Sequence, residues 1–223
     1  MTFSELISKV QEAIQDPDYT DEMVGEILNR GLLAVASGVV LPDKYAVSPP
    51  LPDLYTEGTV ETVVDSGVCD LPTDFNRGLL QVVNDQGEPL RVFSSFRKFL
   101  KENPGKEVGS VRICAVNGKK LLYRDIPSTE ETLEVHYYAA PIPMEDEDDE
   151  PDCLQEGFHH PLLVGFACKE IFNLLEDGID GPKKNTMYWE REFQKGVHDL
   201  GVFIGEDSDP DYMQVENEED YID

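Results

Sequence analysis

The most regular pattern of apolar and polar residues lies between residues 132 and 177. Within residues 132–140 every second side chain is apolar, which predicts a half-buried β-strand, and Pro141 and Pro143 end it. The run at residues 145–152 that follows is mostly acidic, and so many like charges resist burial. We therefore expect this run to cross the surface.

Residues 159–176 form the most apolar stretch of the chain, and a helix that is apolar around most of its circumference is buried on several sides. Only a narrow polar stripe interrupts it, at intervals of four, four and three residues. The stripe consists of Gly165, Lys169, Asn173 and Glu176. Other parts of the chain must cover this helix, and we expect the stripe to contact a neighbouring subunit.

Two shorter amphipathic helices are predicted in residues 1–38. The first begins at Thr2, which precedes Glu5 by three residues in the pattern of a capping box. The second begins at Thr20 and ends at Gly38, because threonine is a common N-cap and glycine a common helix stop. A tight turn joins the two into an antiparallel helical hairpin.

The middle of the chain is predicted to contain β-strands. Residues 39–57 hold four prolines and no periodicity, so we expect an extended connector on the surface. Residues 58–144 hold about six short strand-like segments, which predicts an antiparallel β domain, curled into a small sandwich or open barrel. The Asn-Gly pair at residues 117–118 is the strongest hairpin signal. Residues 85–87 are expected to turn the chain back through residues 89–93 as another hairpin.

A last amphipathic helix is predicted from Lys183 to about Gly201, and Trp189 lies on its apolar side, where we expect it to be core. This helix pairs with the apolar helix as a second helical hairpin over residues 159–204, after an acidic loop at residues 145–158. The simplest α+β architecture makes one four-helix bundle of the two hairpins and inserts the β domain between them.

The end of the chain is predicted to be an extended acidic tail. Residues 205–223 carry nine acidic residues and no Lys or Arg, and such a segment has too little apolar area for a core of its own. We expect it to fold onto a partner, with its few apolar side chains as anchors. These are Tyr212, Met213, Val215, Tyr221 and Ile222.

The formal net charge is −28, and such a surface repels the phosphate backbone of nucleic acids. The charge is uneven, since residues 77–124 hold ten Lys or Arg against four Asp or Glu. This basic middle is either a solvated sheet surface or a place where acidic segments of a neighbouring copy dock. Its short predicted helix supplies our interface candidates Arg97, Lys98 and Lys101.

The sequence shows no motif for catalysis, metal binding or a cofactor. Its acidic runs lack the Gly and Glu of a calcium loop, its four cysteines lack zinc spacing, and it has no phosphate loop, dinucleotide fingerprint or nucleophile elbow. His159 and His160 are adjacent, so they diverge by about 100° on a helix, and we expect both to have a capping or surface role. No apolar run reaches the roughly 20 residues that span a bilayer. The cysteine usage and the absence of a signal pattern predict synthesis in a reducing cytoplasm.

The order of several short motifs resembles the head-to-tail adaptor (connector) proteins of tailed bacteriophages. The resemblance covers residues 2–205 and begins with the short N-terminal helical hairpin. The motifs follow the hairpin in order, through the β segments to the last helix. They are C-D-L-P-T-D-F (residues 69–75), G-E-P-L (87–90), N-G-K-K-L-L-Y (117–123), V-H-Y-Y-A-A-P-I-P (135–143), D-D-E-P (148–151), F-H-H-P-L-L-V-G-F-A-C (158–168) and Y-W-E-R-E-F (188–193).

The resemblance implies a structural protein without enzymatic activity or cofactor. Adaptors of this class form a ring, typically of twelve copies, under the portal protein of the DNA-filled capsid, and they carry the tail or nozzle protein. DNA is expected to pass through the channel of the ring without specific binding, and no membrane is involved. The expected location is the neck of the virion, after assembly in the host cytoplasm.

Two other classes of function stay open from the residues alone. An acidic protein that mimics DNA would use the same charge to inhibit a nucleic-acid enzyme, without assembling with itself. A cell-wall hydrolase would need two carboxylates in a cleft, and 46 acidic residues offer many pairs.

Overall fold

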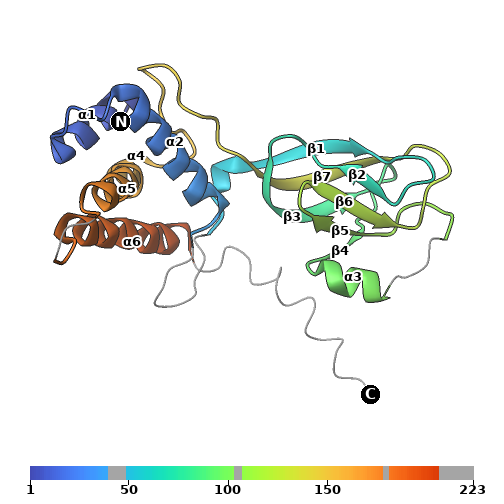
Figure 1. The fold of residues 1–223 in the computed structure, drawn as a ribbon. Helices are drawn as coiled ribbons and strands as arrows, with labels where there is room; N and C mark the ends of the chain where they lie inside the picture. Colours follow the sequence, from blue (N-terminus) through green and yellow to red (C-terminus); the bar gives the residue numbers. More distant parts are fainter. Residues whose placement is uncertain (40–48, 103–106, 178–180, 206–223) are drawn as a thin grey trace. The chain divides into compact units, whose positions relative to one another are not determined.

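The chain folds into an α+β protein with a helical unit and a β unit, as the ribbon in Figure 1 shows. The helical unit is built from both ends of the chain, Met1–Leu54 and Pro141–Asp223, and the β unit from Tyr55–Ala140. The structure is a computed structural model, and it describes residues 1–39, 49–102, 107–177 and 181–205.

Helices α1 (Phe3–Ile14) and α2 (Asp21–Ser37) begin where the sequence predicts. Thr2 Oγ1 accepts a hydrogen bond from the Glu5 backbone N–H at 3.3 Å, and the Thr2 N–H donates to Glu5 Oε2 at 3.0 Å, which completes the capping box. Thr20 Oγ1 accepts from the Met23 N–H at 3.4 Å. These bonds satisfy N–H groups that have no partner inside a helix.

The apolar helix begins three residues before the predicted start, and part of it is π-helical. Helix α4 (Glu156–Phe158), the π-helical turn η2 (His159–Val164) and α5 (Gly165–Leu175) follow one another directly. Pro161 accounts for the wider turn, because proline has no N–H to donate and its ring crowds the carbonyl of the preceding turn.

His159 is buried, so the predicted capping or surface role is wrong for this residue, whereas His160 is exposed. The His159 Nε2 lies 2.8 Å from the carbonyl oxygen of Leu154, and Nδ1 lies 3.1 Å from the amino group of Met1. A carbonyl only accepts and an ammonium group only donates, so the neutral tautomer with hydrogen on Nε2 satisfies both partners. The imidazole thereby connects the π-helical turn to the loop before it and to Met1, two residues before the start of α1.

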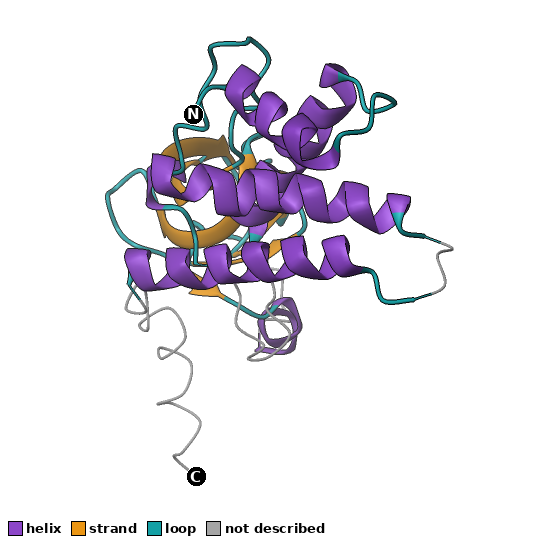
Figure 2. Ribbon diagram, turned by 90° about the vertical axis from the view of Figure 1, so that its left-hand side faces the viewer, coloured by secondary structure: helices purple, strands orange, loops and turns teal. Residues whose placement is uncertain are grey.

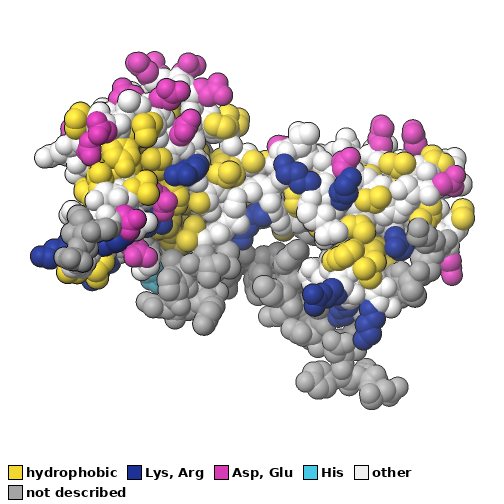
Figure 3. All heavy atoms as spheres, in the orientation of Figure 1, with side chains coloured by type: hydrophobic (Ala, Val, Ile, Leu, Met, Phe, Trp, Pro, Cys, Tyr) yellow, Lys and Arg dark blue, Asp and Glu magenta, His cyan; other side chains and the backbone are white. Residues whose placement is uncertain are grey.

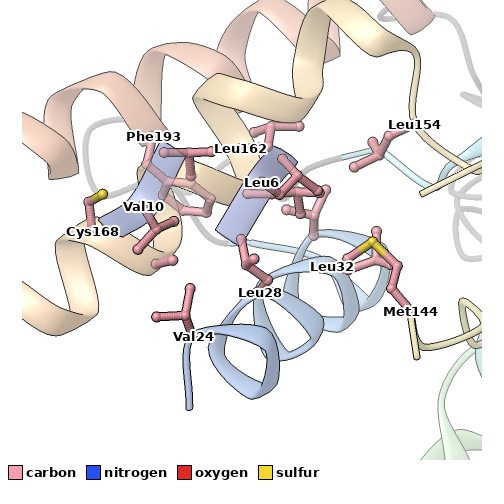
Figure 4. Packing of buried hydrophobic residues seen from close by; sticks show 14 of the residues in the cluster. Leu6, Val10, Val24, Leu28, Leu32, Met144, Leu154, Leu162, Cys168 and Phe193 are labelled. Carbon is pink, nitrogen blue, oxygen red and sulfur yellow. The ribbon is translucent and has the colours of Figure 1, made fainter. Parts of the chain in front are cut away.

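Helix α6 (Lys184–Ile204) packs along α5 and η2, and the α1–α2 pair packs on the other side of these two elements (Figure 2). Side chains from all these helices meet in one apolar cluster, in which Leu6, Leu28, Leu162 and Phe193 point toward one another (Figure 4). Trp189 is only partly buried at its edge, although its place on the apolar side predicts a core position.

Three segments outside the predicted helices also enter this cluster, and one of them is the predicted acidic loop, whose Leu154 is buried. Leu51, from the predicted surface connector, is buried just before the short 3₁₀ helix η1 (Pro52–Leu54). Met144 is buried as well, and Asn29 fixes its backbone by donating to its carbonyl oxygen and accepting from its N–H, both at 2.9 Å.

The described strands of the β unit form two sheets and no closed barrel. The described residues form seven strands, where the sequence predicts about six, and the first includes Tyr55–Glu57 of the predicted connector. One sheet has the order β1 (Tyr55–Glu61), β7 (Thr132–Ala139), β3 (Phe75–Val83). The other has the order β2 (Val68–Asp70), β6 (Lys120–Arg124), β5 (Ile113–Asn117), β4 (Arg91–Phe93).

The pairing of β4 corrects the prediction of a wholly antiparallel domain. The turn after β3 forms as expected, since Asn84 Oδ1 accepts from the N–H groups of Gln86 and Glu88 at 3.1 and 2.8 Å. The return continues only to Leu90, whose N–H donates to the Val82 carbonyl at 2.8 Å, and β4 then pairs parallel with β5. The Leu90 side chain is buried in the cluster between the two sheets, at the point where the chain passes from the first sheet to the second.

Apolar side chains of the two sheets meet in one cluster, which includes Leu133 of one sheet and Leu121 of the other. Helix α3 (Phe96–Glu102) covers the opposite face of the second sheet, where Phe99 packs with Phe93 and Ala115 in a smaller cluster. The two clusters explain why neighbours such as Cys114 and Ala115 are both buried, because successive strand residues point to opposite faces.

Candidate functional site

The polar stripe of the apolar helix faces α6 of the same chain. A Cβ atom on Gly165 would lie 3.5 Å from the Cα and N atoms of Phe193, so the two backbones approach closely there. The Lys169 ammonium lies 4.9 Å from the ring centroid of Phe166 and 5.2 Å from that of Phe193, and it pairs with Glu170 at 3.1 Å. Two aromatic rings and one carboxylate thus stabilise the positive charge of Lys169.

Asn173 and Glu176, the last two residues of the stripe, form hydrogen bonds with residues at the N-terminal end of α6. Lys183 Nζ donates to Asn173 Oδ1 at 3.1 Å, and Glu176 accepts from the Asn185 N–H at 3.0 Å, the Thr186 N–H at 3.1 Å and Thr186 Oγ1 at 2.8 Å. Desolvation raises the pKa of Glu176, but these bonds from Thr186 and Asn185 outweigh it and lower the pKa overall. Contacts within one chain therefore explain the stripe, and its contact with a neighbouring subunit stays a prediction.

The outer side of α6 combines cations with apolar groups. Its positions follow one another at intervals of four, three, four, three and four residues, and all six are exposed. They are Lys184, Tyr188, Arg191, Lys195, His198 and Val202, which we call the outer face of α6. The sequence analysis considered only the apolar side of this helix. The same intervals of three and four residues, applied to its polar side, identify the outer face.

A groove of about 420 Å³ lies between α1 and α2. Phe3 and Ile7 contribute apolar lining, and none of the described residues that line it is Lys or Arg. Its carboxylates come from α2 and from the loop before α4. They are Asp21, Glu22, Glu26, Glu145 and Glu147, and we call this feature the acidic groove.

The acidic loop exposes most of its side chains, as expected, but its backbone is well anchored. The carbonyl oxygens of Asp149 and Glu147 accept from the N–H groups of Phe3 and Ser4 at 2.7 and 3.1 Å, so the loop satisfies free donors at the start of α1. Asp149 Oδ2 accepts from the N–H groups of Glu145 and Asp146 at 2.7 and 2.9 Å, and these bonds lower the pKa of its carboxyl. Acidic side chains gather over this end of the helical unit in Figure 3.

The three predicted interface cations of the β unit lie on α3. Arg97 and Lys101 are exposed and Lys98 is partly buried, while Phe99 points into the sheet. The Arg124 guanidinium lies 5.3 Å from the ring centroid of Phe99. Docking of a neighbouring copy at these cations stays a prediction.

The described cysteines are not activated, and the described residues hold no cluster of metal ligands. Burial raises the pKa of Cys69 and Cys153 to about 11 and that of Cys114 and Cys168 to about 12, so these thiols are protonated at neutral pH. Among residues 1–39, 49–102, 107–177 and 181–205, no group of three or more His, Cys, Asp or Glu is placed to hold a metal ion. Likewise, none of the described helices is both long and apolar enough to cross a membrane.

The predicted anchors of the tail lie outside the described residues. This applies to Tyr212, Met213, Val215, Tyr221 and Ile222, so their docking stays a prediction.

Comparison with known proteins identifies the family. Residues 1–216 match the family model described as "SU10 adaptor protein", a span that includes the whole β unit and every described helix. No curated protein sequence matches the chain significantly. Since the match covers nearly the whole chain, the protein belongs to the SU10 adaptor family, the phage head-to-tail adaptor family that the order of its motifs predicts.

Proposed function

We propose that this protein forms a ring beneath the portal protein and joins the DNA-filled capsid to the tail. The observation that carries the proposal is the family match over residues 1–216. In this proposal the predicted helical hairpins, residues 1–38 and 159–204, act together as a four-helix bundle that builds the ring. The predicted β domain, residues 58–144, is the platform for the tail protein. The net charge of −28 keeps DNA from sticking to the channel wall, since like charges repel.

Electron microscopy of portal rings with and without the purified protein tests this function. The expected result is an added ring on the portal, and portal rings that stay bare would count against it. A protein that instead binds and inhibits a nucleic-acid enzyme as a monomer would belong to the DNA-mimic class.

The acidic tail supplies a second test. Deletion of residues 206–223 should abolish addition of the ring to portals, because the tail anchors, including Tyr212 and Tyr221, dock there or on a neighbouring copy. Unchanged occupancy of portals by the truncated protein would overturn this part of the proposal.

The basic middle predicts a dependence on salt. If Arg97, Lys98 and Lys101 meet an acidic surface of a neighbour, assembly should weaken as the salt concentration rises. Dissolved ions screen the attraction between exposed charges, over a screening length of roughly 10 Å at 0.1 M salt. Replacement of all three by Gln should remove most of this dependence, which sedimentation at several salt concentrations measures.

A further inference from the structure

The helical unit concentrates its few cations on one side. Outside residues 55–140 the chain has eight Lys or Arg against thirty-three Asp or Glu. Five of the eight nevertheless lie in α5, in α6 or directly before α6. Three of these five, Lys184, Arg191 and Lys195, belong to the outer face of α6, none of whose six positions is acidic.

These three cations have no partner in the described part of the chain. Neither an ion pair nor a side-chain hydrogen bond joins Lys184, Arg191 or Lys195 to another described residue. Apolar side chains are exposed beside them, since Met187, Tyr188 and Val202 are 55%, 57% and 62% exposed. Aromatic and apolar groups next to Arg are typical of protein–protein contacts.

The acidic groove has the complementary chemistry. Its apolar floor lies between carboxylates, and those of Glu22 and Glu26 have no cationic partner among the described residues. Glu22 and Glu26 are one helical turn apart, as are Arg191 and Lys195, so both pairs have the same spacing along a helix.

The two surfaces lie on opposite sides of the helical unit. Both α6 and the α1–α2 pair pack against α5 and η2, which lie between them (Figures 1 and 2). The outer face of α6 is directed away from this packing, and so is the acidic groove. One copy therefore cannot bring the two surfaces together, whereas two copies can.

We propose that the outer face of α6 in one copy docks into the acidic groove between α1 and α2 of the next copy. A contact between two different surfaces is heterologous, so each copy in a pair keeps one free surface for a further copy. Repeated contacts form a closed ring when the rotation between successive copies adds up to a full turn. This inference rests on the proposed ring and names the surfaces that hold it together.

Two charge-reversed variants test the contact. Arg191→Glu with Lys195→Glu, and Glu22→Lys with Glu26→Lys, should each lower the association constant of the full chain at least about tenfold, because each places like charges in contact. An equimolar mixture of the two variants should regain assembly, since every contact in an alternating ring is again between opposite charges. Analytical ultracentrifugation at low salt measures these constants.

A matched control separates this contact from the effect of net charge. Lys9→Glu with Arg30→Glu changes the charge by the same amount as the α6 variant, but at positions of α1 and α2 that do not belong to the lining of the acidic groove. No loss of association is expected, whereas general repulsion predicts an equal loss. Circular dichroism of each variant verifies that the helices are intact.

Three outcomes would overturn the inference. They are a wild-type chain that stays monomeric at low salt, variants that assemble like wild type, and a mixture that fails to recover. The portal experiment keeps this result separate from the proposed function. If the α6 variant still adds a complete ring to portals, the adaptor function holds and the proposed contact is wrong.

Discussion

The helical unit and the β unit differ most in how they carry charge. Residues 55–140 hold ten Lys or Arg and thirteen Asp or Glu, whereas the rest of the chain holds eight and thirty-three. The net charge of −28 is therefore mainly a property of the segments that form the helical unit. In the proposed ring, the acidic segments of the helical unit would repel DNA, and the fewer cations would be available for contacts between copies.

The two units have separate cores. In the helical unit, Gly31 lies against Phe166 and Gly196 against Pro161. In the β unit, Phe75 contacts Tyr137 at a ring-centroid distance of 5.5 Å. Each unit thus has its own core, and substitutions should act on one unit at a time.

The largest expected effect comes from truncating a core leucine in each unit. Leu162→Ala and Leu133→Ala remove side chains that are 0% exposed, so each should destabilise its unit by about 2–5 kcal/mol. Hydrogen exchange should accelerate in the helices of the first variant and in the strands of the second. An equal acceleration in both units of either variant would show that they unfold together.

A smaller effect is expected at the crossing of α6 and the π-helical turn. In Gly196→Ala the new Cβ would lie 2.8 Å from Pro161 Cβ and 3.3 Å from the Pro161 carbonyl carbon, which cannot move freely. We expect a loss of about 1–3 kcal/mol in a denaturant titration. Gly157→Ala is the control, because nothing lies within 4 Å of its new Cβ, and its stability should not fall.

In the β unit, Tyr137→Phe should cost about 0.5–1.5 kcal/mol, because the buried hydroxyl donates to Asp74 Oδ1 at 2.7 Å. Burial and then Asp74 raise the pKa of Tyr137 to about 12. The folded state therefore holds the proton more tightly than the unfolded state, whose tyrosine titrates near 10. This stabilisation is present below pH 10 and is lost as the pH rises toward 12. The Phe variant should lack this alkaline loss, which unfolding curves between pH 8 and 12 would reveal.

The smallest effect is expected at the cap of α6. Glu176→Gln removes a carboxylate that accepts three hydrogen bonds, so α6 should unfold slightly more easily at neutral pH. The pKa of Glu176 is lowered in the folded state, so its contribution is present above the unfolded pKa and is lost as the pH falls through the folded value. Wild type and variant should therefore converge in acid, with the exposed Glu190→Gln as control. A constant difference at all pH values would contradict this role.

Local signals made part of the fold predictable. The capping box at Thr2 and the Asn-Gly turn at residues 117–118, where Gly118 has a φ of 64°, depend on a few adjacent residues. The parallel pairing of β4 and the burial of His159 depend on partners distant in sequence, so no local pattern indicated them. The two candidate surfaces are only partly predictable from the sequence. Spacing alone identifies the outer face of α6, but the acidic groove needs the packing of α1 on α2.

The pairing of β1 with β7 has a consequence for the evolution of the protein. These are the strands by which the chain enters and leaves the β unit, and Tyr55 and Tyr138 are direct partners across them. Partners in an antiparallel pair have Cα atoms only about 4.5–5.5 Å apart. The β unit therefore starts and finishes at nearly the same point, like a long loop between two residues of a helical protein. Insertions, deletions or exchange of this unit can change its surface without requiring a new arrangement of the helices.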